Sequence, residues 1–131
     1  MQSIWSESCK FRKREVLDKD IKTDTIIIGA GMAGILIGYM LKQNGIDVIL
    51  IDAAEMASGN TKNTTAKITS QHDLIYNKLI QEFGEEKAKQ YARANELAIR
   101  KYREIIKERK IECDFEELPA YIYSLNDTDL L

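Results

Sequence analysis

The sequence predicts an α/β fold that begins with a parallel β-α-β unit, and three features of residues 24–52 support this prediction. A β-branched run, Thr25–Ile28, ends at a glycine and is typical of a buried strand. An apolar stretch of helical length follows over residues 31–44 and stops at an Asn-Gly pair, a common C-terminal signal. A second buried run, Val48–Ile51, comes next. Because a helix joins the two strands, we expect them to lie parallel.

The glycines between the first strand and the helix have the spacing G-x-G-x-x-G. Gly29 allows a sharp turn out of the strand, Gly31 leaves room for a pyrophosphate beside the backbone, and Gly34 lets the helix pack closely on the strand. The helix then directs its N-terminal N–H groups and the positive end of its dipole at the phosphates. This pattern predicts a Rossmann-like FAD- or NAD(P)-binding unit.

Residues 26–41 also have a competing interpretation as a membrane span. The stretch is uncharged, and Gly34 and Gly38 have the small-xxx-small spacing of packed membrane helices. It is shorter than the roughly 20 residues that a span requires. Its glycines weaken a continuous helix and its three consecutive isoleucines favour a strand, so the nucleotide-binding interpretation is preferred and no membrane span is expected.

Asp52 ends the second strand, where an acid in such units accepts hydrogen bonds from the hydroxyls of an adenosine ribose. Its carboxylate would repel a 2′-phosphate, which favours FAD or NAD over NADP. The alternative is an ordinary strand-end residue that faces water. The candidate cofactor contacts in this unit are Gly29, Gly31, Met32, Ala33, Gly34, Asp52 and Ala53.

The segments around this unit are less regular. Residues 1–22 are polar and charged, and we expect an N-terminal extension ahead of a domain that covers residues 23–131. Residues 53–71 form a long loop rich in small and hydroxyl side chains, and loops of that length are usually functional.

Two helices and further strands are predicted after this loop. Ser70 and Asp73 resemble a capping pair that opens a helix over residues 72–83. A longer helix is predicted over residues 85–110, with acidic side chains at its start and basic ones at its end. Residues 111–125 predict one or two strands interrupted by proline.

Composition excludes several classes of partner. The 131 residues are 44% hydrophobic and 31% charged, and 19 basic against 21 acidic residues give a net charge of −2. This balance gives no electrostatic reason to expect nucleic acid. Cys9 and Cys113 are far apart, and His72 is the one histidine, so no metal site is expected. Two unpaired cysteines and no apolar leader favour the cytoplasm.

The segment from Thr23 to Glu96, "TDTIIIGAGMAGILIGYMLKQNGIDVILIDAAEMASGNTKNTTAKITSQHDLIYNKLIQEFGEEKAKQYARANE", resembles the N-terminal part of FAD-dependent oxidoreductases of the D-amino-acid oxidase superfamily. Within it, the similarity is to the bacterial branch whose members often carry a C-terminal Rieske domain. The resemblance implies FAD as cofactor and an amine or amino acid, oxidised at a C–N bond, as substrate. It also implies flavin contacts in the loop after the second strand, at Ser58, Gly59, Asn60, Asn63, Thr64 and Thr65.

Members of that superfamily are several times longer, so we expect an incomplete domain without turnover of its own. No catalytic residue is assigned, because His72 has no identifiable partner and is expected to lie at the start of a helix. The alternatives are a nucleotide-binding module without turnover and an NAD-dependent Rossmann protein. Apolar faces left uncovered are expected to cause self-association.

Overall fold

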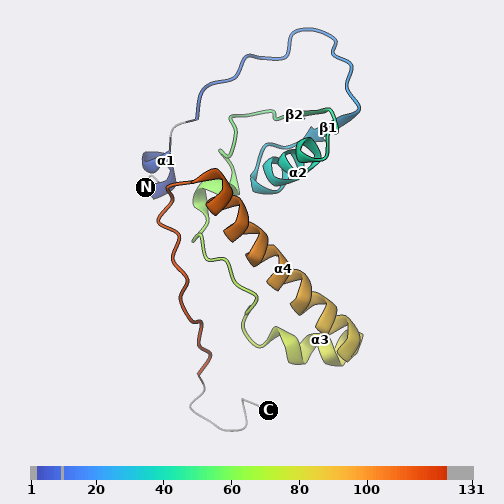
Figure 1. Ribbon diagram of the computed structural model, residues 1–131, viewed down its shortest axis with the longest axis vertical. Helices are drawn as coiled ribbons and strands as arrows, with labels where there is room; N and C mark the ends of the chain where they lie inside the picture. Colours follow the sequence, from blue (N-terminus) through green and yellow to red (C-terminus); the bar gives the residue numbers. More distant parts are fainter. Residues whose placement is uncertain (1–2, 10, 124–131) are drawn as a thin grey trace. The chain divides into compact units, whose positions relative to one another are not determined.

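The computed structural model describes residues 3–9 and 11–123, and the chain divides into two compact units, residues 1–66 and 67–131. The first unit contains α1 (Ile4–Ser8), β1 (Thr25–Ile28), α2 (Met32–Gln43), β2 (Val48–Ile51) and the 3₁₀ turn η1 (Asn60–Asn63). The second unit contains α3 (Ile75–Phe83) and α4 (Glu85–Arg109). Figure 1 labels the helices and strands.

The first unit is built on the β-α-β arrangement that the sequence predicts. β1 and β2 pair in parallel, with Thr25 opposite Val48 and Ile28 opposite Ile51. α2 crosses between them and lies against both strands (Figure 1). The α/β class and the parallel start are therefore confirmed, and the strand boundaries agree with the prediction. Residues 26–41 form a strand, a turn and a helix, and no described helix is long and apolar enough to cross a bilayer.

The two-stranded sheet leaves much of its apolar surface in contact with solvent. Ile26 is 57% exposed and Ile28 is 84% exposed. Parallel sheets are normally covered on both faces, because their strands are apolar on both sides. Among the described residues of this unit, the buried apolar side chains are those of Ala30 and Ala57. The unit thus has the start of a Rossmann-like sheet but very little core.

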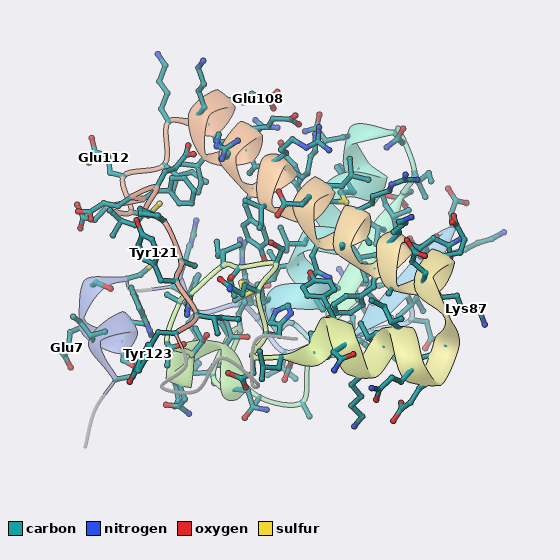
Figure 2. The ribbon with its side chains drawn as sticks, turned by 90° about the horizontal axis from the view of Figure 1, so that it is seen from below. Glu7, Lys87, Glu108, Glu112, Tyr121 and Tyr123 are labelled. Carbon is teal, nitrogen blue, oxygen red and sulfur yellow. The ribbon has the colours of Figure 1, made fainter. Side chains whose placement is uncertain are left out.

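The second unit is a helical hairpin. Gly84, with φ of +83°, joins α3 to α4, and Ala88 is buried where the two helices meet. Acidic residues at the start of α4 and basic residues at its end complement the helix dipole. Lys110 ends α4 in the left-handed conformation. Figure 2 shows Lys87 at the corner between the helices and Glu108 near the other end of α4.

Two predictions for the second unit are wrong. Ser70 does not cap a helix, because its hydroxyl donates to Glu96 Oε1 at 2.5 Å, and α3 begins after Leu74 without a side-chain cap. Residues 111–123 form no strand, and the described part of the second unit contains no other strand that could pair with them. The segment is held to α4 instead, through two 2.6 Å contacts between the Arg103 guanidinium and the Glu117 carboxylate.

The remainder of the predicted strand region, residues 124 and 125, lies outside the described residues. Figure 2 shows Tyr121 and Tyr123 on the extended segment that follows α4, and both side chains are exposed.

Candidate cofactor site

The glycine loop, residues 29–31, connects β1 to α2 and turns sharply at its first residue. Gly29 has φ of +107°, a conformation that side chains disfavour. Its N–H donates to Ile51 O at 2.8 Å, so the parallel hydrogen-bond ladder extends one residue beyond β1 before the chain turns. The predicted role of Gly29 as the turn residue is in accord with this geometry.

Gly34 is required by the packing of the chain on itself. A Cβ atom built at this position would lie 2.0 Å from Gly29 O and 3.3 Å from Ile27 Cγ2. Only glycine permits this approach of the first turn of α2 to the end of β1. Gly38 is buried one turn later, where a Cβ would meet Ile27 Cδ1 at 3.4 Å, an ordinary contact.

Gly31 has no comparable reason to be a glycine. Its backbone is extended, with φ of −80° and ψ of −176°, which other residues adopt without strain. A Cβ atom here would have its nearest contact with Thr61 Oγ1, at an ordinary 3.4 Å. The packing of the chain therefore accounts for Gly29 and Gly34 but leaves room for a side chain at Gly31.

Asp52 fixes the backbone of the glycine loop. Its Oδ2 accepts the N–H of Ala30 at 2.6 Å, and its Oδ1 accepts the N–H of Ala54 at 2.8 Å. These two backbone hydrogen bonds, the one from Ala54 more than the one from Ala30, lower the carboxyl pKa below its ordinary value of 3.8. The side chain is exposed, and each carboxylate oxygen keeps a second lone pair for a further donor.

The hydroxyl-rich loop, residues 53–66, returns to the glycine loop at two points. Ala57, buried and with φ of +57°, donates its N–H to Ala30 O at 2.9 Å. Thr61, in η1, accepts the N–H of Met32 on its Oγ1 at 3.0 Å. Since the N-cap Gly31 has no side chain, the Thr61 hydroxyl satisfies one of the amides that the first turn of α2 leaves without a carbonyl partner.

Two more amides belong to the same turn. The first intrahelical bond of α2 is made by Ile35 N–H to Gly31 O at 3.0 Å, so the N–H groups of Ala33 and Gly34 precede it. Together with the helix dipole, these amides make the start of α2 a favourable place for an anion.

The predicted contacts of the hydroxyl-rich loop have different environments. Asn60 and Asn63 lie in η1 and are exposed, as are Gly59 and Thr65. Ser58 and Thr64 are half-buried, and the Thr64 hydroxyl accepts the N–H of Ala66 at 3.2 Å. Ala53 is exposed directly after Asp52.

Sequence reasoning missed three residues that organise the site. Ala30 and Ala57 act through their main chains, which leave no sequence signal. Thr61 belongs to a stretch with several threonines, and nothing in the local pattern distinguishes it from Thr64 or Thr65.

His72 lies in the second unit, ahead of α3. Its Nδ1 is 3.1 Å from Tyr91 Oη of α4, and the two rings meet edge to face. No local pattern indicates this partner, which is 19 residues away. The contact fastens the segment before α3 to α4, and a catalytic role for His72 gains no support from it.

Comparison with known proteins identifies a family and a relative of this chain. A family model described as FAD dependent oxidoreductase matches residues 24–130. The chain is 38% identical over 126 residues to YhfW of Bacillus subtilis (strain 168), whose name refers to a Rieske 2Fe-2S iron–sulfur protein. The match covers 96% of this chain and 25% of YhfW, so the chain spans about a quarter of the length of that curated relative. No solved structure matches the chain.

These matches confirm the resemblance to the D-amino-acid oxidase superfamily and to its Rieske-containing branch. The family match extends over most of the chain and includes the glycine loop, Asp52 and the hydroxyl-rich loop. The chain belongs to the family of FAD-dependent oxidoreductases.

Proposed function

We propose that this chain binds FAD at the start of α2 and forms part of the cofactor site of a flavin-dependent oxidoreductase. The observation that carries the proposal is the space at Gly31. The chain packs tightly at Gly34 but would accept a Cβ at Gly31, where the nearest atom is Thr61 Oγ1 at 3.4 Å, beside helix amides that favour an anion. A pyrophosphate is the group for which a glycine at this position of a dinucleotide-binding loop leaves room.

The residues of the first unit suit the phosphates and the ribose of FAD. The amides of Ala33 and Gly34 in the first turn of α2 are proposed to face the phosphates, and Met32, whose N–H is held by Thr61, stays a candidate contact beside them. The exposed Asp52 carboxylate has free lone pairs for ribose hydroxyls while it holds Ala30 and Ala54. Its negative charge disfavours a 2′-phosphate and hence NADP.

The hydroxyl-rich loop supplies a second set of donors and acceptors. Its candidates, each still a prediction, are Ser58, Gly59, Asn60, Asn63, Thr64 and Thr65, together with Ala53 ahead of them. We add Thr61 to this set, because its hydroxyl already lies at the first amide of α2.

The substrate class is proposed from the family alone. When bound, FAD would accept a hydride from the substrate. For the longer protein we propose an amine or amino acid, oxidised at a C–N bond, as that substrate. The residues of this chain bind and orient the cofactor, and no described residue is proposed to exchange a proton with substrate. A nucleotide-binding module without turnover is the second candidate, favoured by the very small core of the unit.

Titration of the 131-residue chain with FAD, followed by flavin fluorescence and visible absorbance, tests the proposal. We expect saturable binding to the wild type and a large loss in Gly31→Val, whose side chain would fill the open space. NAD, titrated by calorimetry because it gives no flavin signal, should not bind. Saturable binding of NAD without FAD would contradict the proposal and favour an NAD-dependent protein.

The two candidate functions differ in the chemistry expected after the cofactor has bound. In the longer protein, anaerobic addition of amines or amino acids should bleach the visible flavin band if the chain serves an oxidoreductase. A band that persists with every amine tested would favour the module without turnover.

A further inference from the structure

The N-terminal clamp, residues 3–8, consists of α1 and its N-cap. Ser3 Oγ accepts the N–H of Trp5 at 3.3 Å and so caps the helix. A helix of this length is unstable by itself, because the entropy lost in forming the first turn exceeds the stabilisation from the hydrogen bonds of that turn. Its order therefore depends on contacts with another part of the first unit, and those contacts lie on η1.

Two side chains of the clamp hold main-chain carbonyls of the hydroxyl-rich loop. The Trp5 indole Nε1–H donates to Thr64 O at 2.8 Å, and the Ser3 hydroxyl donates to Lys62 O. The two carbonyls lie on either side of Asn63, at the end of η1. Trp5 is 37% exposed, whereas Phe11, the next aromatic residue, is 54% exposed and lies beyond α1.

The same turn reaches the proposed cofactor site. Thr61, one residue before Lys62, accepts the N–H of Met32 at the start of α2. Hydrogen bonds on the two sides of η1 thus link Trp5, through the main chain of η1, to the first turn of α2, whose next amides are proposed to face the phosphates. α1 lies outside residues 24–130, so the family match does not include the Trp5 end of this path.

We propose that Trp5 is a positioning residue for the cofactor: the clamp holds η1 in place, and η1 holds Thr61 on the α2 N-terminus before FAD arrives. The inference rests on the proposed FAD function. Ordering a loop in advance removes its entropy cost from the binding step, so the clamp should tighten FAD binding without touching the ligand. Trp5 is the one tryptophan of the chain, so its emission reports this site alone.

The first test needs no cofactor. Amide hydrogen exchange is measured in residues 57–64 and at Met32 for wild type, Trp5→Phe and the control Phe11→Leu, all in the full chain. Trp5→Phe removes the indole N–H and keeps an aromatic ring at the same place. We expect exchange roughly two- to tenfold faster in Trp5→Phe, the range for loss of one neutral hydrogen bond, and wild-type rates in Phe11→Leu. Wild-type rates in Trp5→Phe would overturn the proposal.

The second test is FAD titration of the same three proteins. We expect weaker binding in Trp5→Phe, by up to the same factor, unchanged binding in Phe11→Leu, and a change in Trp5 emission as FAD binds the wild type. The proposal would be overturned if Trp5→Phe bound FAD as tightly as the wild type or more tightly. It would also be overturned if the Trp5 emission of the wild type stayed constant while FAD bound. A wild type that binds no FAD refutes the FAD function itself, while the exchange rates still show whether the clamp holds η1.

Discussion

A methyl group added at Gly34 should destabilise the first unit, whereas one added at Gly31 should leave it intact. At Gly34 the new Cβ would lie 2.0 Å from Gly29 O, and ordinary contacts begin at 3.4 Å. The oxygen cannot retreat cheaply, because the Gly29 N–H is bonded to Ile51 O. α2 must move away from the strands instead, and overpacking of this kind costs about 1–3 kcal/mol.

At Gly31 the corresponding Cβ meets only Thr61 Oγ1, at 3.4 Å, and the backbone angles suit alanine. Replacing glycine by alanine at such a position changes stability by about +0.4 to +1 kcal/mol, through the unfolded chain. Gly31→Ala should therefore unfold at the same or slightly higher denaturant concentration than wild type. It should also bind FAD more weakly, because the methyl group enters the space proposed for the pyrophosphate.

Denaturant unfolding followed by circular dichroism, with FAD titration of the same samples, separates the two roles. A loss of about 1–3 kcal/mol corresponds to roughly 5- to 150-fold in the unfolding equilibrium, which such curves resolve. Equal destabilisation by Gly31→Ala and Gly34→Ala would refute the reasoning from packing. Wild-type FAD affinity in Gly31→Ala would refute the assignment of the open space to a ligand.

Three further predictions concern the site and the exposed sheet. Hydrogen bonds lower the Asp52 pKa, so the stability that its carboxylate contributes is present above the ordinary pKa of 3.8 and is lost as pH falls through the pKa of the folded state. Asp52→Ala should therefore flatten the acid side of a plot of stability against pH. It should also weaken FAD binding, on the order of 10- to 100-fold. Thr61→Val should expose Met32 N–H to faster hydrogen exchange and weaken FAD binding, and Thr65→Val, an exposed neighbour, serves as control. Light scattering should show that the chain self-associates through its exposed sheet, and Ile28→Lys should reduce this self-association. A monodisperse wild type would contradict the prediction.

The Asp52 prediction differs from what the sequence alone suggests. A strand-end carboxylate facing water would be expected to affect cofactor binding without affecting the fold. The structure has both carboxylate oxygens on backbone N–H groups, one of them in the glycine loop. Loss of the side chain should therefore loosen the loop as well as remove a ribose acceptor.

The β-α-β unit could be predicted from sequence because its signals are local. Consecutive isoleucines favour a strand, glycines at fixed spacing favour the turn, and Asn44 with Gly45 ends the helix. Each of these preferences acts within a few residues, so tertiary contacts reinforce them without redirecting them.

The wrong or missing predictions all depend on distant partners. Ser70 has the composition of a cap, but Glu96 on α4 takes its hydroxyl. Residues 111–123 have strand-forming residues, but their own unit contains no described strand to pair with, and Arg103 contacts Glu117 instead. α1 is too short to be predicted by propensity, and its order comes from contacts with η1.

The glycine loop shows why a motif search recovers only part of such a site. Ala30 donates its N–H to Asp52 and accepts from Ala57, so an apolar residue joins the end of β2 to the hydroxyl-rich loop. The neutral bond between Ala57 N–H and Ala30 O contributes on the order of 1 kcal/mol, and neither bond requires a particular side chain at Ala30 or Ala57. These bonds fix the loop before any ligand binds, which removes ordering cost from the binding step. The affinity of the site should therefore depend on main-chain geometry as much as on the polar residues that the sequence marks.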